Sequence, residues 1–264
     1  MQKGMAYVML GRCERLEDLS IAGKLDFSQI KCDPTALEES KRLERNFDLA
    51  EKEEIQEKMN YWKICYLNVR SMKASNGHAE DVAIDNIIMD SDMFGLGETW
   101  LEQDQKRGFE GFSGYFANFG HGKGVAGYSR IELVSPPEKF ESESYSAIKF
   151  KTPQFCIIFL YLSKTYNKED LSILLDAWID ADVPCAVIGD INENLMKLTK
   201  STKFEKMMRE RGFQQLIKEP TCETGSMIDH IYVNPAMATK NVVTHVDAAY
   251  YSDHDILSLH IPKC

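Results

Sequence analysis

The sequence predicts an α/β fold in which short strands alternate with helices. Eight short apolar runs recur after residue 61, at 62–67, 93–96, 124–128, 147–150, 155–162, 186–188, 228–233 and 256–261. Each has the length of a strand, and helical apolar spacing is found between some of them. Apolar residues make up 44% of the 264-residue chain and charged residues 27%. This balance favours a protein with a substantial core, so the mixture of runs predicts an α/β sandwich.

Three segments between these runs are expected to form helices. They cover residues 79–90, 168–181 and 201–211. In the second, apolar residues from Leu171 to Trp178 form one stripe, as on a helix that packs one face against a sheet. We interpret the stripes as core faces.

The cysteines and the apolar runs exclude several classes of protein. The seven cysteines are scattered and odd in number, and no CxxC pair occurs. This pattern argues against a disulfide framework or a zinc cluster and favours a reducing compartment. No apolar run approaches the roughly 20 residues that span a bilayer, and the N-terminus lacks the features of a signal peptide. We therefore expect no membrane association.

The chain is acidic, with a formal net charge of −10. A non-specific nucleic-acid binder is normally basic, so the charge counts against that class. It does not count against an enzyme whose carboxylates hold a cation.

Composition divides the chain into two regions. Residues 33–59 are dense in Glu, Lys and Arg, and Asp33 before Pro34 is typical of a helix start. We expect a charged helical linker over residues 41–60. It would join an N-terminal segment, residues 1–40, to a domain over residues 61–264.

Polar residues that can carry chemistry follow the apolar runs or interrupt them. They are Asn68, Glu98, Tyr161, Asp190, Asn192, Asp229, Asp253 and His254. Loops at strand ends are where catalytic groups are usually mounted. Each residue alone is more simply explained as a helix cap or a turn residue. The prediction of a site therefore depends on the whole set.

The spacing within this set has physical consequences. Asp190 and Asn192 are two residues apart, so an extended backbone places both on one face. Asp229 lies in an apolar run, where a carboxylate is costly unless it is paired. His254 is an available partner, and such a carboxylate would fix the tautomer of the imidazole and raise its pKa. Because neighbouring residues of a strand point to opposite faces, Asp253 and His254 can share a site only where the chain bends.

The remaining polar residues are suited to phosphoryl chemistry. Glu98 and Asp253 offer hard oxygen ligands of the kind that Mg²⁺ or Mn²⁺ prefers, together with substrate phosphate. Asn and Tyr side chains can donate to phosphoryl oxygens.

The motifs, taken in order, resemble the endonuclease/exonuclease/phosphatase superfamily. They are Asn68, Glu98-Thr99-Trp100, Tyr161, Gly189-Asp190-Ile191-Asn192, Ile228-Asp229-His230-Ile231 and Ser252-Asp253-His254. The resemblance runs from about residue 63 to 261. Asn68-Val69-Arg70-Ser71, Gly97-Glu98-Thr99-Trp100-Leu101 and Pro220-Thr221 are similar to the apurinic-like endonuclease domains of retrotransposons and Helitron-type transposons. The resemblance implies a four-layer α/β-sandwich with two packed mixed sheets and outer helices.

The resemblance also implies an activity and a role for each residue. It implies a divalent-metal-dependent phosphodiester hydrolase, a DNA endonuclease of transposon origin, with Mg²⁺ or Mn²⁺ as cofactor. The metal ligands would be Glu98, Asn68 and Asp253, and the catalytic residues would be Asp190, Asn192, His254, Asp229 and Tyr161. Asp190 would orient or deprotonate the attacking water, and His254, held by Asp229, would stabilise charge on the phosphoryl group. We expect a monomer in the nucleus or cytoplasm with DNA as its partner.

The chain departs from the family pattern at Lys164. Apurinic-type enzymes often have an Asn three residues after the Tyr, where this chain has Lys164. This departure leaves the phosphate contact of the loop open. Two alternatives to a DNA endonuclease also stay open. One is a phosphoesterase of the same fold that acts on a lipid or inositol phosphate, and the other is an inactive relic that binds nucleic acid.

Two further motifs occur in the chain. Residues 122–127 spell GxGxxG, but a dinucleotide site needs a strand before the motif and a helix after it, so we expect a turn that enters a strand. Residues 6–19 resemble the last motif of Helitron-type superfamily 1 DNA helicases, in which the residue at the place of Arg12 is an arginine finger. The chain has no GxxxxGK[ST] motif. Residues 1–40 are thus expected to be a helicase remnant without ATPase activity.

Overall fold

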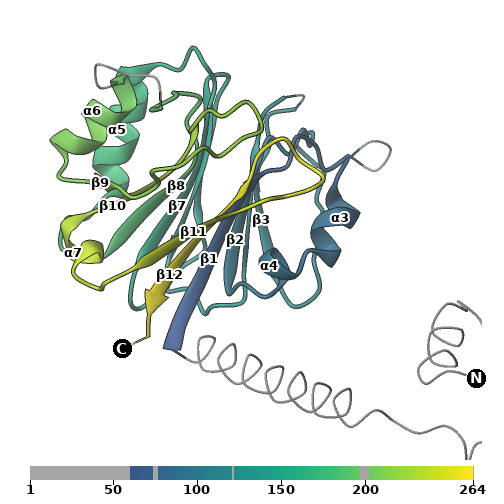
Figure 1. Cartoon of the computed structure of the whole chain (residues 1–264), viewed down its shortest axis with the longest axis horizontal. Helices are drawn as coiled ribbons and strands as arrows, with labels where there is room; N and C mark the ends of the chain where they lie inside the picture. The colour runs from purple at the N-terminus through teal and green to yellow at the C-terminus, as the bar shows by residue number, and fades with distance from the viewer. Residues whose placement is uncertain (1–59, 74–76, 121, 197–201, 264) are drawn as a thin grey trace, which may run out of the picture. The chain divides into compact units, whose positions relative to one another are not determined.

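Two six-stranded mixed sheets lie face to face in the structure, a computed structural model (Figure 1). It describes residues 60–73, 77–120, 122–196 and 202–263. The expected helicase remnant and the linker, apart from Asn60, lie outside the described residues. Within the described part, no helix is long and apolar enough to cross a membrane.

The first sheet has the strand order β11-β12-β1-β2-β4-β3. Its strands are β1 (Tyr61–Asn68), β2 (Met93–Gly97), β3 (Ser113–Ala117), β4 (Val125–Ser129), β11 (Val243–Asp247) and β12 (Ile256–Pro262). Strands β1 and β2 run parallel, and the other neighbouring pairs run antiparallel.

The second sheet has the order β5-β6-β7-β8-β10-β9 and repeats this plan. Its strands are β5 (Glu138–Glu141), β6 (Tyr145–Lys151), β7 (Cys156–Leu162), β8 (Cys185–Asp190), β9 (Gln214–Gln215) and β10 (Asp229–Val233). Strands β7 and β8 run parallel, and the other neighbours run antiparallel. Each sheet thus has a central parallel pair whose carboxyl ends lie at one edge.

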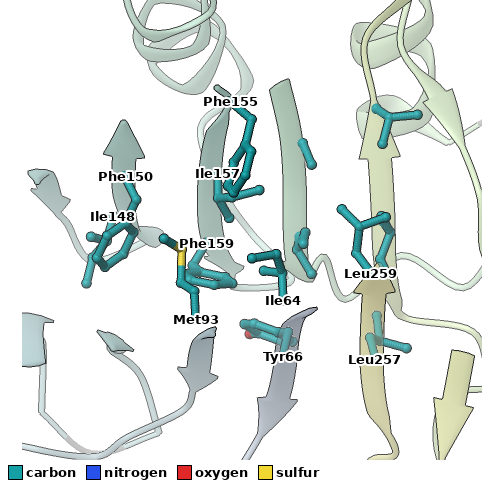
Figure 2. Packing of buried hydrophobic residues seen from close by; sticks show 14 of the residues in the cluster. Ile64, Tyr66, Met93, Ile148, Phe150, Phe155, Ile157, Phe159, Leu257 and Leu259 are labelled. Carbon is teal, nitrogen blue, oxygen red and sulfur yellow. The ribbon is translucent and has the colours of Figure 1, made fainter. Parts of the chain in front are cut away.

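The main core fills the space between the two sheets. Along β1, Ile64 and Tyr66 point into this space, while Cys65 and Leu67 point to the outer face, as the period of a strand requires. Figure 2 shows Tyr66 and Phe159 facing each other between the sheets, and their rings stack with centroids 6.2 Å apart.

Helices cover the outer face of each sheet. On the first sheet lie α3 (Ala79–Ile84) and α4 (Asn86–Met89); on the second lie α5 (Lys168–Trp178) and α6 (Lys203–Glu210), and α7 (Pro235–Ala238) follows β10 (Figure 1). The apolar stripe of α5 that begins at Leu171 is buried against the second sheet. The four-layer sandwich predicted from the sequence is confirmed.

The helix predicted over residues 79–90 is two helices. Asp85 separates them with an extended backbone, and its side chain accepts hydrogen bonds from the backbone N–H groups of Ile87 and Ile88. An aspartate that caps the backbone in this way begins a new helix. The helices predicted over 168–181 and 201–211 are shorter in the structure but lie where they were expected.

Residues 122–124 of the GxGxxG motif form a turn and residues 125–127 begin strand β4, as predicted. Gly122 and Gly124 have φ angles of +72° and +97°, which favour glycine.

Gly95 in β2 allows the close approach of Phe159 from the opposite sheet. A Cβ atom at this position would lie 2.4 Å from a carbon of the Phe159 ring. We therefore expect Gly95→Ala to lower the free energy of unfolding by about 1–3 kcal/mol, through overpacking of the core. Urea denaturation would measure the change. Gly108→Ala is the matched control, since a Cβ there meets nothing within 4 Å, and an equal effect of both substitutions would contradict the expectation.

Candidate active site

Asn68, the last residue of β1, joins the ends of the two parallel pairs. Its amide nitrogen donates hydrogen bonds to Glu98 Oε1 at 3.1 Å and to Asp190 Oδ2 at 2.8 Å. Glu98 directly follows β2 of the first sheet, and Asp190 is the last residue of β8 in the second sheet. Asn68 therefore links the two sheets. The oxygen of Asn68 accepts from the backbone N–H of Arg70 at 3.1 Å, which determines how the amide is oriented.

Glu98 is held at both of its carboxylate oxygens. Oε1 accepts from Asn68, and Oε2 accepts from the indole N–H of Trp100 at 3.2 Å. Both donors are neutral. Among the described residues no ion pair with Glu98 is seen, so its negative charge is available to a cation.

Asp190 is buried at the centre of the site. Its Oδ1 accepts from the backbone N–H of Asn192 at 2.8 Å, and its Oδ2 accepts from Asn68. Burial and the charge of Asp229 raise the pKa of Asp190 to about 8, although His254 and two hydrogen bonds act in the opposite direction. A carboxylate with a pKa near neutrality is suited to accept a proton.

Asp229 and His254 form a buried pair beside Asp190. Asp229 lies opposite Asp190 on the neighbouring strand, and its Oδ2 is 2.8 Å from His254 Nδ1. The hydroxyl of Thr221 donates to the same oxygen at 2.9 Å and accepts from the backbone N–H of Asp229. Burial acts to lower the pKa of His254, but Asp229 and the other nearby carboxylates raise it to about 10. His254 is therefore an imidazolium at neutral pH.

Asp253 and Tyr161 lie at the margin of the site. Asp253 pairs with Arg70, and its Oδ1 is 3.9 Å from His254 Nε2. Tyr161, opposite Asp190 in the parallel pair, donates its hydroxyl to the backbone oxygen of Gly122 at 3.0 Å. Burial and the charges of Glu98 and Asp190 raise the pKa of Tyr161, so the hydroxyl keeps its proton.

The backbone of the site is strained. Six non-glycine residues in the described part of the chain have positive φ angles, and five of them belong to the loops of the site: Arg70, Ser71, Glu98, Trp100 and Asn192. Such conformations cost on the order of 1 kcal/mol each and cluster at functional sites. The strain is independent support for a functional role of this edge.

The structure brings all eight predicted site residues to one edge of the sandwich. Sequence reasoning assigned no role to three of their partners, which are Trp100, Thr221 and Arg70. All three lie inside the motifs that carry the resemblance, but their side-chain partners follow from loop geometry. Lys164 is exposed on the loop after β7.

A match to a protein-family model shows to which family the chain belongs. The model for the Endonuclease/Exonuclease/phosphatase family matches residues 65–254, a span that contains every residue of the site. The chain belongs to this family. No curated protein matches the chain.

Solved nuclease structures show the fold of this endonuclease/exonuclease/phosphatase member. An AP endonuclease from Archaeoglobus fulgidus is 19% identical with a TM-score of 0.61, over 75% of this chain and 98% of that one. The endonuclease domain of TRAS1, a telomere-specific non-LTR retrotransposon, is 16% identical with a TM-score of 0.58, over 76% and 98%. The 3′ phosphatase NExo from Neisseria, bound to a product DNA hairpin, is 18% identical with a TM-score of 0.59, over 76% and 99%.

The charge of Asp229 is expected to control the protonation of His254 in this endonuclease/exonuclease/phosphatase domain. Asp229→Asn removes the charge that raises the pKa of His254, and burial then favours the neutral ring. The pKa should fall from about 10 to about 6.5 or below. An NMR titration of the metal-free protein would measure it. Asp253→Asn, which removes a more distant carboxylate, should lower the pKa less; an unchanged pKa in Asp229→Asn would contradict the assignment.

Proposed function

We propose that the chain is a divalent-metal-dependent phosphodiester hydrolase, and specifically a DNA endonuclease of transposon origin. One observation carries the proposal. A continuous set of contacts joins Glu98, a carboxylate able to hold a cation, to Asp190, a carboxylate able to accept a proton. Beside them lies the imidazolium of His254. These are the three kinds of group that hydrolysis of a phosphodiester requires.

The residues around Glu98 fit a divalent cation of the Mg²⁺ or Mn²⁺ type. Each oxygen of Glu98 accepts one neutral hydrogen bond and keeps a lone pair. Asp253, proposed as a further ligand, pairs with Arg70 through Oδ2 and keeps a buried Oδ1 without a hydrogen-bond partner. Asn68 is proposed as a further ligand through its oxygen, which accepts one hydrogen bond, from the backbone N–H of Arg70, and keeps a lone pair. When bound, the cation would supply positive charge to the phosphoryl oxygens.

The other residues would act on the water and on the phosphate. Asp190 would accept the proton of the attacking water, because its pKa lies near neutrality. His254 would donate from Nε2 to a phosphoryl oxygen, since Nδ1 is engaged by Asp229. Asn192 and Tyr161 would contact the phosphate once their present partners, the backbone oxygens of Leu162 and Gly122, are exchanged for substrate.

DNA is proposed as the substrate because of the similar solved structures and because of the amino-acid sequences of the motifs. The neighbours include an AP endonuclease, a retrotransposon endonuclease domain and a 3′ phosphatase with bound DNA. The motifs around Asn68, Glu98 and Thr221 are similar to those of transposon endonucleases. A monomer that acts on DNA in the nucleus or cytoplasm is the corresponding proposal for assembly and location.

We further propose that the nuclease domain, residues 61–264, follows a helicase remnant at residues 1–40 and a charged linker at 41–60. The support is the similarity of residues 6–19 to a Helitron-type helicase motif and the dense charge of residues 33–59. Both lie outside the described residues.

Metal-dependent nicking of a supercoiled plasmid tests the proposed function. The purified chain should nick plasmid with Mg²⁺ or Mn²⁺, and a chelator should abolish the activity because the charge supplied at Glu98 is lost. Adding back the metal in excess should restore it. Nicking that persists in chelator would contradict metal dependence.

A substrate panel separates the proposed function from its alternatives. Plasmid, abasic duplex and a phosphoinositide would be assayed with the same preparation. Turnover of the phosphoinositide alone would favour a lipid phosphoesterase of the same fold. Binding of DNA without any turnover would favour an inactive relic.

A further inference from the structure

We propose that Trp100 is a positioning residue that orients the Glu98 carboxylate for a divalent cation. The inference rests on the proposed function and assigns to the indole a role that the family relationship does not supply here. Trp100 Nε1 donates to Glu98 Oε2 at 3.2 Å, while Asn68 holds Oε1 at 3.1 Å. The carboxylate is thereby fixed at both oxygens before any cation arrives.

The backbone places the indole where it is needed. The backbone N–H of Trp100 donates to Lys123 O at 3.0 Å, and Met72 donates its N–H to Thr99 O at 2.8 Å. The loop is therefore held from two sides, by the segment after β1 and by the turn before β4. Glu98 and Trp100 both have positive φ angles, 48° and 57°. In this backbone conformation the side chains of Glu98 and Trp100 are in contact.

The chemistry of the indole suits this role. An indole N–H is a donor without a lone pair in the ring plane, so it cannot compete with Glu98 as a ligand. It is also neutral, so it leaves the charge of Glu98 for the cation, whereas a lysine or arginine would compensate that charge. Partners of this kind typically change metal affinity by about 10- to 100-fold.

Trp100→Phe tests the inference because it removes the N–H and keeps an aromatic ring. Titration calorimetry with Mn²⁺ on the metal-free chain should show a dissociation constant raised about tenfold. The kcat at saturating Mn²⁺ should change by less than about threefold, since the hydrogen bond acts on binding of the cation. A merely structural role would not separate these two quantities.

Trp62→Phe is the matched control. Its indole N–H also donates to a side chain, Gln154 Oε1, at 3.0 Å, so the same group is deleted at the start of β1, away from Glu98. We expect its dissociation constant for Mn²⁺ to stay at the wild-type value. An unchanged constant in folded Trp100→Phe, or an equal rise in both variants, would overturn the inference.

A second variant and a second measurement cover a folding failure of Trp100→Phe. Benzothienyl-alanine at position 100 has the size of the indole but no N–H. It should raise the dissociation constant for Mn²⁺ in the same way as Trp100→Phe. A dissociation constant equal to that of the wild type would overturn the inference. Emission of Tb³⁺ excited through tryptophan should be retained in Trp62→Phe and lost in Glu98→Gln, and emission unaffected by Glu98→Gln would overturn it. Wild-type protein that binds no Mn²⁺ would instead contradict the proposed function itself, and the inference with it.

Discussion

Asp190→Asn is expected to lower the rate of metal-dependent DNA nicking by about a thousandfold. The amide keeps the shape of the side chain but cannot accept a proton from the attacking water, and general bases contribute about 10²- to 10⁴-fold. The carboxylate is well placed for this task because burial and Asp229 raise its pKa to about 8. Single-turnover nicking of a defined duplex would measure the rate.

The control for this substitution is Asp176→Asn on helix α5. Asp176 forms an exposed ion pair with Arg211 on the outer layer, so the same chemical change is made without contact to the site. Its rate should equal that of the wild type. A nicking rate for Asp190→Asn within about tenfold of wild type would exclude a general-base role, given the usual size of that effect.

His254→Ala is expected to reduce nicking by about 10²- to 10³-fold, because a preorganised charge beside the phosphoryl group is lost. It should also destabilise the fold by about 3–5 kcal/mol, since Asp229 is then buried without its partner. The rate and the free energy of unfolding would be measured on the same preparation.

His254→Asn separates the two effects. Asparagine can still donate a hydrogen bond to Asp229, so part of the stability should return, but it carries no positive charge and the rate should stay low. If His254→Asn recovers the rate together with the stability, the imidazolium has no role beyond support of the fold.

The eight interior strands could be predicted from the sequence, whereas the four edge strands could not. Interior strands are buried on both faces, and they read as continuous apolar runs. The missed strands β3, β5, β9 and β11 are the edges of the two sheets. Their residues are largely half-buried or exposed, as in Glu138–Glu141. Because an edge strand is covered on one side only, more of its residues are exposed and polar. It therefore has no continuous apolar run by which it could be identified.

The sequence predicted which residues lie together at the edge of the sandwich, but not all of their contacts. Asp229 lies in an apolar run, where a carboxylate needs a partner, and the order of the motifs indicated His254 as that partner. Their contact is confirmed. The orientation of Asn68 was not foreseen, because it depends on the backbone N–H of Arg70 in a loop with positive φ angles. Side-chain direction in such a loop does not follow the period of a strand.

The strained loops around Glu98 and Asn192 have a consequence for substitution by glycine. Glycine adopts positive φ angles without steric cost, so a substitution to glycine at these positions would relieve backbone strain. A charged and a bulky aromatic side chain nevertheless occupy two of these positions, Glu98 and Trp100. Glycine at either position would relax the backbone, but it would also remove the carboxylate or the indole that this loop conformation brings into contact.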